Sequence, residues 1–281
     1  MSDFFSGLES MGLNGLSSIN IYEEEKKEEV SSKDNVKVPK VKEEDFLFDK
    51  KVTCPCCDKE FLSKTVKTGK PRLLGSDTDM RPKYAGIEPL KYEAIVCPHC
   101  GYAALGKFFG NLASSQIKLI REQISKNFTK LPKTGDTYTY DDALNRYKLA
   151  LFNAIVKKAK ISERAYTCLK TAWLYRAKGE SISGDTPTLK SIIEDCQNKE
   201  KEMLLNAYEG FYVSREKEIF PICGMDETTY DYLLADIAVR LEKYEEAMNF
   251  ASGIILSRNA NTRIKEKARD LRDSIKNKVN K

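Results

Sequence analysis

"TCPCCDKEF" (residues 53–61) and "VCPHCGYA" (residues 96–103) are the two stretches that decide how this chain folds. Each contains two cysteines separated by two residues. This spacing lets a tight turn point both sulfurs at one metal ion, and two such turns complete a tetrahedral thiolate shell. The pattern therefore predicts a zinc ribbon with one structural Zn²⁺. The predicted ligands are Cys54, Cys57, Cys97 and Cys100.

Two further potential ligands, Cys56 and His99, lie inside these turns. A shell that used Cys56 would lose the two-residue spacing that both turns share. His99 is in the middle of its turn, where a side chain normally points outward. The residues after the two turns, Asp58 and Gly101, can adopt the positive φ that closes them. We expect the four-cysteine shell, and a shell that includes Cys56 or His99 is the alternative.

Neither a redox centre nor a catalytic zinc is the favoured interpretation of these cysteines. A Cys-x-x-Cys redox motif needs a low-pKa thiol and a thioredoxin-like βαβ context, which the sequence does not show. A catalytic zinc needs three protein ligands and one open position, whereas four matched thiolates close the shell. His99 is the single histidine of the chain, which excludes a Ser-His or Cys-His pair elsewhere.

Composition indicates a folded protein of the cytoplasm. The chain has 281 residues, of which 41% are hydrophobic, which is enough for a buried core. It has no run of 18 apolar residues and no signal-peptide pattern at its N-terminus, so we expect no membrane span. In that compartment, eight cysteines are better explained as metal ligands and buried thiols than as disulfides. The net charge of +5 permits a nucleic-acid partner without demanding one.

The chain divides into three predicted segments. Residues 1–45 form an acidic tail whose charged part is too poor in apolar residues to fold, with a short docking helix near Phe4 as a further interpretation. Residues 46–110 form the zinc-ribbon domain, with strands expected at 61–67 and 92–96. Residues 111–281 form a helical domain. The predicted fold class is therefore α+β, mostly α.

Apolar residues recur at helical spacing throughout the third segment. Leu144, Tyr147, Leu151 and Ile155 form one stripe, with Asp141 as the expected N-cap. Thr186 followed by a proline is a typical helix start. The stretch "YLLADIAVRLEKYEEAMNFASGII" (232–255) resembles a tetratricopeptide repeat, but no clean period of 34 residues joins it to the preceding helices. We expect antiparallel, tetratricopeptide-like helical hairpins.

Residues 52–109 resemble the bacterial family catalogued as domain of unknown function 2225. The resemblance rests on "VTCPCCDKEF", on "SDTDMRPKYAGIEPLKYEAIVCPHCGYA" and on the two phenylalanines that follow at 108 and 109. The helical stretches "ALNRYKLALFNAIVKKAKIS" and "YLLADIAVRLEKYEEA" are similar as well. This resemblance implies a metal-binding ribbon followed by helices, and it implies no particular reaction.

The loop "GSDTDMRPKYAGIEP" (75–89) is the other candidate binding element. Two carboxylates in an Asp-x-Asp pattern could hold a divalent cation or pair with a nearby arginine or lysine. The alternative is structural, with Asp and Gly supplying turn chemistry and the tyrosine packing under the ribbon. The candidate residues are Asp77, Asp79, Arg81 and Tyr84.

The leading functional hypothesis is a non-enzymatic adaptor that binds a protein or peptide partner through its helical domain. One alternative is a nucleic-acid-binding zinc ribbon, with Tyr84 and Tyr92 available for stacking. Its basic residues would be Lys64, Lys67, Lys70, Arg72, Arg81 and Lys83. A metal-dependent hydrolase centred on Asp77 and Asp79 is a third hypothesis.

Overall fold

The computed structural model describes residues 42–279, which belong to one compact unit. Most of the expected acidic tail, including the segment near Phe4, lies outside the described residues. Regular structure begins before residue 46, the predicted start of the ribbon domain, because Glu43–Phe46 forms a 3-10 turn (η2). The Glu43 carboxylate accepts hydrogen bonds from Lys91 and from the Tyr92 hydroxyl at 2.8 Å each. These two contacts fix the turn against the rest of the fold.

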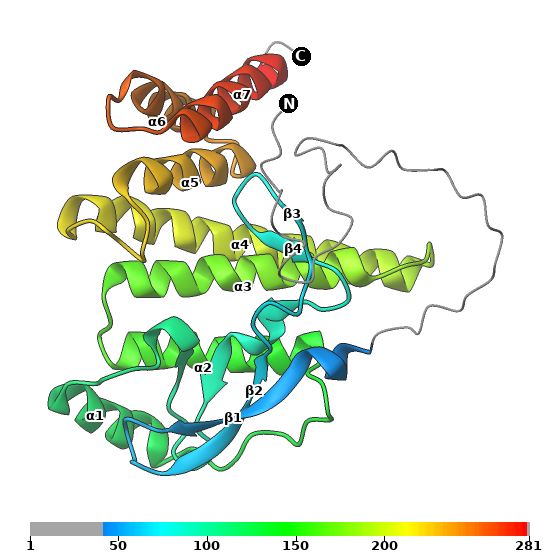
Figure 1. The fold of residues 1–281 in the computed structure, drawn as a ribbon, viewed down its shortest axis with the longest axis vertical. Coiled ribbons are helices and arrows are strands. Elements are labelled where there is room, and N and C mark those ends of the chain that lie inside the picture. The colour runs from blue at the N-terminus through cyan, green and yellow to red at the C-terminus, as the bar shows by residue number, and fades with distance from the viewer. Residues whose placement is uncertain (1–41, 280–281) are drawn as a thin grey trace, which may run out of the picture. The chain divides into compact units, whose positions relative to one another are not determined.

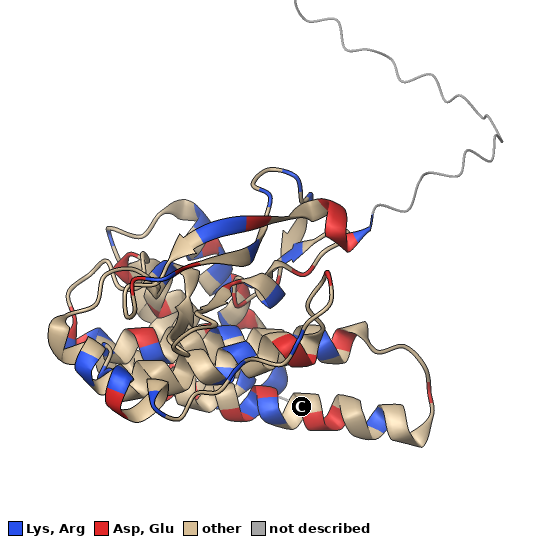
Figure 2. Ribbon diagram, turned by 90° about the horizontal axis from the view of Figure 1, so that it is seen from below, with Lys and Arg blue, Asp and Glu red and all other residues tan. Residues whose placement is uncertain are grey.

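Three antiparallel β-hairpins lie on one side of a stack of helices (Figures 1 and 2). Each hairpin is a separate two-stranded sheet. The strand predicted at 61–67 is present as β2, and the one predicted at 92–96 is shorter, because Tyr92 belongs to a 3-10 turn. The middle hairpin, for which no strands were predicted, overlaps the candidate loop 75–89. The hairpins are β1 (Leu47–Thr53) with β2 (Glu60–Val66), β3 (Leu73–Ser76) with β4 (Pro82–Tyr84), and β5 (Ala94–Val96) with β6 (Ala103–Leu105).

The helices follow the hairpins and stack in chain order from α2 to α7 (Figure 1). This arrangement confirms the predicted α+β, mostly α class with helical hairpins. None of the described helices has an apolar stretch long enough to cross a membrane. The helices are α1 (Ser114–Ile120), α2 (Tyr140–Val156), α3 (Ile161–Ser181), α4 (Pro187–Lys217), α5 (Glu227–Arg240), α6 (Tyr244–Leu256) and α7 (Thr262–Val279). Short 3-10 turns, η3 (Pro89–Tyr92) and η4 (Gly106–Phe108), flank the third hairpin, and a π-helical turn, η5 (Arg121–Ser125), continues α1.

Helix starts were predicted correctly at one position and wrongly at another. Thr186 caps α4 by accepting a hydrogen bond from the backbone N–H of Leu189, as its position before a proline indicated. The cap of α2 is Thr139 and not Asp141. Thr139 accepts from the N–H of Asp142 at 3.1 Å, and the Asp142 carboxylate accepts in return from the N–H of Thr139 at 3.0 Å. This reciprocal capping box satisfies two otherwise unpaired backbone donors, which a lone Asp141 cap would not do.

The ribbon and the helices share their hydrophobic cores. The largest core runs through α2 to α7 and takes in Leu90, Ala94 and Leu105 from the ribbon segment. A second core surrounds the cysteine turns and takes in Ile120 and Ile124 from the α1–η5 helix. The predicted boundary at residue 110 therefore separates two kinds of secondary structure that are packed into a single body.

Candidate metal centre

The two cysteine turns lie at the ends of the first and third hairpins, where they meet. The Sγ atoms of the four predicted ligands all lie within 4.8 Å of one another. Two pairs join the two turns, at 3.6 Å between Cys54 and Cys100 and 3.7 Å between Cys57 and Cys97. A disulfide would bring two sulfurs to about 2 Å, so these are four separate sulfurs facing a common centre. They form a group that could hold one metal ion.

The backbone closes both turns in the same way. The N–H of Asp58 donates to the carbonyl of Cys54 at 2.9 Å, and the N–H of Gly101 donates to the carbonyl of Cys97 at 3.1 Å. Both donors have the positive φ predicted for them, 59° at Asp58 and 73° at Gly101. Glycine is required at the second position for a further reason, because an added Cβ would overlap the Phe128 ring.

Neither of the two spare residues belongs to the group of four sulfurs. His99 is exposed at the outside of its turn. Cys56 is fully buried, but its side chain is not part of the group of four. Its backbone N–H points at the Cys54 sulfur at 3.4 Å. The structure thus brings together the four cysteines that share the two-residue spacing.

Side chains of helical residues donate hydrogen bonds to the backbone carbonyls of both cysteine turns. Arg121 donates to the backbone carbonyl of Cys56 at 2.8 Å, and the Ser125 hydroxyl donates to that of Cys100 at 2.9 Å. Arg121 and Ser125 begin and end the π-helical turn η5, so one turn of helix contacts both halves of the centre. From α2, the buried Asn153 amide donates to the Gly101 carbonyl at 3.1 Å. The sequence contained no motif that identified these three residues.

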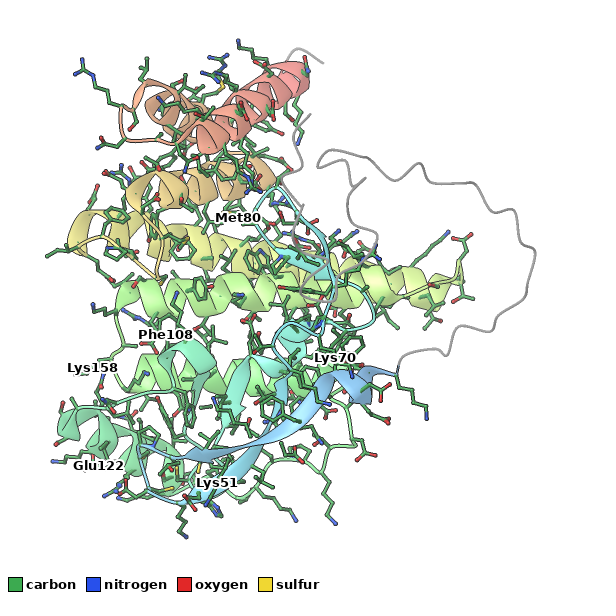
Figure 3. The ribbon with its side chains drawn as sticks, viewed as in Figure 1. Lys51, Lys70, Met80, Phe108, Glu122 and Lys158 are labelled. Carbon is green, nitrogen blue, oxygen red and sulfur yellow. The ribbon has the colours of Figure 1, made fainter. Side chains whose placement is uncertain are left out.

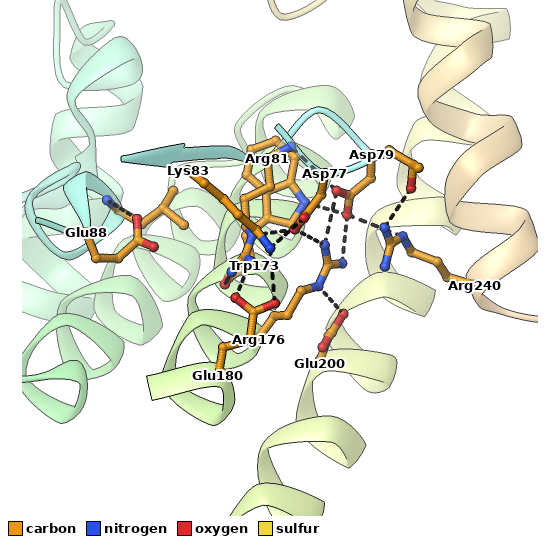
Figure 4. A network of polar contacts seen from close by, with 12 residues as sticks. Asp77, Asp79, Arg81, Lys83, Glu88, Trp173, Arg176, Glu180, Glu200 and Arg240 are labelled. Atoms are coloured by element: carbon orange, nitrogen blue, oxygen red, sulfur yellow. Dashed lines mark hydrogen bonds and ion pairs between the residues drawn. The ribbon is translucent and has the colours of Figure 1, made fainter. Parts of the chain in front are cut away.

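The loop with the two aspartates forms the turn of the β3–β4 hairpin, which runs across α3 and α4 toward α5 (Figure 3, where Met80 marks the turn). Asp79 is fully buried there. Its carboxylate accepts a hydrogen bond from Trp173 Nε1 at 2.9 Å and two from the Arg176 guanidinium at 2.7 and 3.1 Å (Figure 4). Both partners lie on α3, three residues apart, and therefore on the same side of that helix.

Asp77 and Arg81 close the turn with a second ion pair. Arg81 is 1% exposed and donates from Nε to Asp77 at 2.7 Å and from Nη2 to Glu180. Burial raises the pKa of Asp77, but the ammonium of Lys83 and the guanidinium of Arg81 outweigh it and lower the pKa to about 2. The stabilisation from this carboxylate is complete above its ordinary pKa of 3.8 and is lost as the pH falls toward 2.

The network extends to two more helices. Arg176 also donates to Glu200 on α4 at 2.7 Å. Arg240 on α5 donates to the Thr78 hydroxyl at 2.9 Å, and its Nε lies 3.5 Å from the Asp79 carboxylate. The β3–β4 turn is therefore tied to α3, α4 and α5 by charged groups. We call these residues the hairpin network, and they are Asp77, Thr78, Asp79, Arg81, Lys83, Trp173, Arg176, Glu180, Glu200 and Arg240.

Tyr84, the fourth candidate of the loop, is not part of the hairpin network. It packs with a separate cluster that includes Phe46, Ile87 and Tyr92. Of the basic and aromatic residues suggested for nucleic acid, Arg81 is 1% exposed and Tyr92 is 6% exposed. These two side chains are inside the protein and are not available to a nucleic acid.

The fold and the site define a ribbon protein with a four-cysteine group that could bind a metal, joined to stacked helical hairpins. The chain belongs to the family described as "uncharacterized protein conserved in bacteria (DUF2225)", which matches residues 47–275. An "uncharacterized protein" of Borreliella burgdorferi is 23% identical over 143 residues, which cover 43% of this chain and 51% of that relative. The match thus spans about half the length of the relative. No solved structure matches the chain.

We predict that Asp79→Asn destabilises the protein by about 1.5–3 kcal/mol, because it replaces the charged acceptor of the buried Arg176 guanidinium with an amide, while Asp77 and Glu200 still pair with Arg176. Urea unfolding followed by circular dichroism measures the change. The matched control is Glu60→Gln, since Glu60 pairs with Lys51 in an ion pair that is exposed on both sides and contributes less than about 1 kcal/mol. Equal stability losses in the two variants would contradict the structural importance of the hairpin network.

Proposed function

We propose that this protein is a non-enzymatic, zinc-dependent adaptor of the cytoplasm that binds a protein or peptide partner through its helical hairpins. The observation that carries the proposal is the spacing of the four sulfurs. Tetrahedral Zn²⁺ with Zn–S bonds of about 2.3 Å has S–S edges of about 3.8 Å. The Cys54–Cys100 and Cys57–Cys97 sulfur pairs, at 3.6 and 3.7 Å, fit such an edge, and all six pairs lie within 4.8 Å.

A zinc ion in this group would be structural. Four thiolates fill its coordination shell, so there is no position for a substrate or an activated water. The ion would instead cross-link two hairpins that are distant in the sequence. Arg121, Ser125 and Asn153 then attach α1, η5 and α2 to the cross-linked turns through the carbonyl contacts described above.

The helical hairpins supply a surface suited to a partner. A groove of about 550 Å³ between α2, α3 and α4 is lined by the apolar side chains of Leu151, Ile155 and Met203. Ile155 is 52% exposed, although its spacing in the sequence suggested a buried stripe, and its neighbour Phe152 is 50% exposed. Large apolar side chains exposed beside a groove are typical of a protein-binding surface. An amphipathic segment of a partner protein is the occupant we propose.

The geometry gives less support to the two other hypotheses. A hydrolytic metal at Asp77 and Asp79 would have to displace the guanidinium groups of Arg81 and Arg176, which already neutralise both carboxylates. A nucleic-acid surface would lack Arg81 and Tyr92, since both are buried. Neither hypothesis gains a specific contact from the structure, so the adaptor hypothesis is the one we retain.

We expect one Zn²⁺ per chain in protein purified without chelator, as measured by elemental analysis. Cys97→Ser removes one of the four grouped sulfurs, and we expect it to lower the zinc content sharply. Cys56→Ser is the matched control, because it changes a buried cysteine of the same ribbon that lies outside the group of four. Loss of zinc in the Cys56 variant, or full retention in the Cys97 variant, would show that the ligand set is different.

The adaptor function is tested by capture of a partner from cytoplasmic extract on the immobilised full-length protein. We expect Ile155→Asp to abolish the capture of a protein that the unmodified chain retains, because it places a charge in the apolar groove. Leu256→Asp is the control, since Leu256 is 82% exposed on α6 and does not line the groove. If no protein is retained reproducibly, or if both variants retain it equally, the proposal fails for this surface.

A further inference from the structure

A second cleft, separate from the apolar groove, lies between the β3–β4 turn, α5 and α7. It has a volume of about 510 Å³. Thr78 of the β3–β4 turn, Tyr232 and Asp236 of α5, and residues of α7 line the cleft. The cleft therefore lies next to the place where the β3–β4 turn contacts the helices.

The wall formed by α7 is basic. Arg263, Lys267 and Lys278 line the cleft and recur at a spacing that places them on one side of the helix. Within residues 42–279, none of the three makes an ion pair. Lys267 lies over the Tyr232 ring at 5.4 Å from its centroid, so its ammonium is held at the cleft. The adjacent apolar stripe of the same helix, which includes Ile264 and Ala268, is buried in the core.

One cation of the cleft, Arg240, is already paired with carboxylates of the protein. Arg240 lines the cleft and lies 3.5 Å from Asp79 and 2.8 Å from Asp236 through its Nε atom. The backbone that brings Asp79 to this place is the turn of a β-hairpin. This surface of the helices thus already pairs a guanidinium group with carboxylates of a β-hairpin turn and of α5, and the unpaired cations of α7 line the same cleft.

We propose that the cleft between α5 and α7 binds an acidic peptide segment of a partner protein. Arg263, Lys267 and Lys278 pair with its carboxylates. Residues 263 to 278 span about 22 Å along a helix, a length that about seven residues of extended chain cover. The cleft shares no lining residue with the apolar groove, so the result of the Ile155→Asp experiment does not decide this proposal.

The other charges of the cleft favour a peptide over a nucleic acid. Asp236 and Asp270 also line it and would repel a continuous phosphate backbone, whereas a peptide can place a neutral or basic residue opposite them. Tyr232 is 3% exposed, so its ring is not available to stack on a base. The cleft therefore matches a segment of mixed sequence in which carboxylates alternate with uncharged residues.

The test uses the full-length, zinc-loaded protein and a fluorescein-labelled nine-residue peptide of alternating glutamate and serine, with binding measured by fluorescence anisotropy at low salt. The control peptide has glutamine in place of glutamate. We expect the glutamate peptide to bind and the glutamine peptide not to bind. The affinity should fall as salt is raised, because the contacts are exposed ion pairs. Failure of the glutamate peptide to bind, or equal binding of both peptides, would overturn the proposal.

The site is located with two charge-reversal variants of the same helix. Arg263→Glu/Lys267→Glu should weaken binding of the glutamate peptide by about tenfold or more. Arg269→Glu/Lys276→Glu makes the same change in net charge at two exposed residues outside the cleft and should leave the affinity nearly unchanged. Equal weakening in both variants would show that only the general charge of α7 matters, which contradicts the proposal.

Two further measurements keep the result interpretable. Lys267→Met removes one charge while keeping an apolar contact with Tyr232, so a loss of binding in this variant, with an unchanged circular dichroism spectrum, supports the cleft without charge reversal. A nine-nucleotide single-stranded RNA is tested in parallel. Tighter binding of this RNA than of the glutamate peptide, weakened by Arg263→Glu/Lys267→Glu and unaffected by Arg269→Glu/Lys276→Glu, would replace the peptide proposal with a nucleic-acid site.

Discussion

The convergence of four cysteine sulfurs within 4.8 Å is the constraint on which the ribbon depends. The two strands joined by the turn that contains Cys97 and Cys100 have three residues each, and an isolated two-stranded hairpin of that size is at best marginally stable in water. A metal bound by both turns would supply the missing stability, because binding energy at a site that exists only in the folded chain is folding energy. The contacts of Arg121 and Ser125 extend this effect, since the carbonyls that they bind belong to the same two turns.

The hairpin network solves a different problem, which is the placement of the ribbon on the helices. A fully buried carboxylate such as Asp79 is expensive to desolvate, and its pairing with Arg176 and Trp173 offsets a cost that an apolar contact would not have imposed. What such a network provides is a specific position for the β3–β4 turn on the helices. An apolar side chain can slide along a helical surface, whereas the Asp79 carboxylate has hydrogen-bond partners at one place on α3. The Asp-x-Asp pattern that resembled a cation site is thus accounted for by the seating of the β3–β4 turn.

The sequence was sufficient to predict features that depend on residues close together along the chain. The cysteine spacing identified the four sulfurs that come together, and the positive φ at Asp58 and Gly101 followed from the residue types that close such turns. Thr186 before a proline identified the start of α4. Periodicity identified the buried side of the last helices, but it did not show that Ile155 would lie at the edge of a groove, because exposure there depends on how α4 packs.

The sequence was insufficient to predict side-chain contacts between residues that are far apart along the chain. Asp79 lies more than ninety residues before Trp173 and Arg176, and nothing in the local pattern of the loop indicates those partners. The same is true of the π-helical turn, whose residues carry no motif and whose importance comes only from the turns that they contact. Of the hairpin network, the sequence therefore suggested only pairing within the loop, such as Asp77 with Arg81, and not the partners on α3, α4 and α5.

Amide hydrogen exchange before and after removal of the bound metal with a chelator tests the central claim most directly. The account predicts that protection is lost in β1, β2, β5, β6 and the α1–η5 helix, because all of them depend on the cross-linked turns. Protection in α5, α6 and α7 should persist, since their apolar sides are buried in a core that does not contain the cysteine turns. Unchanged protection of the cysteine hairpins after metal removal, or an equal loss across α5 to α7, would contradict it.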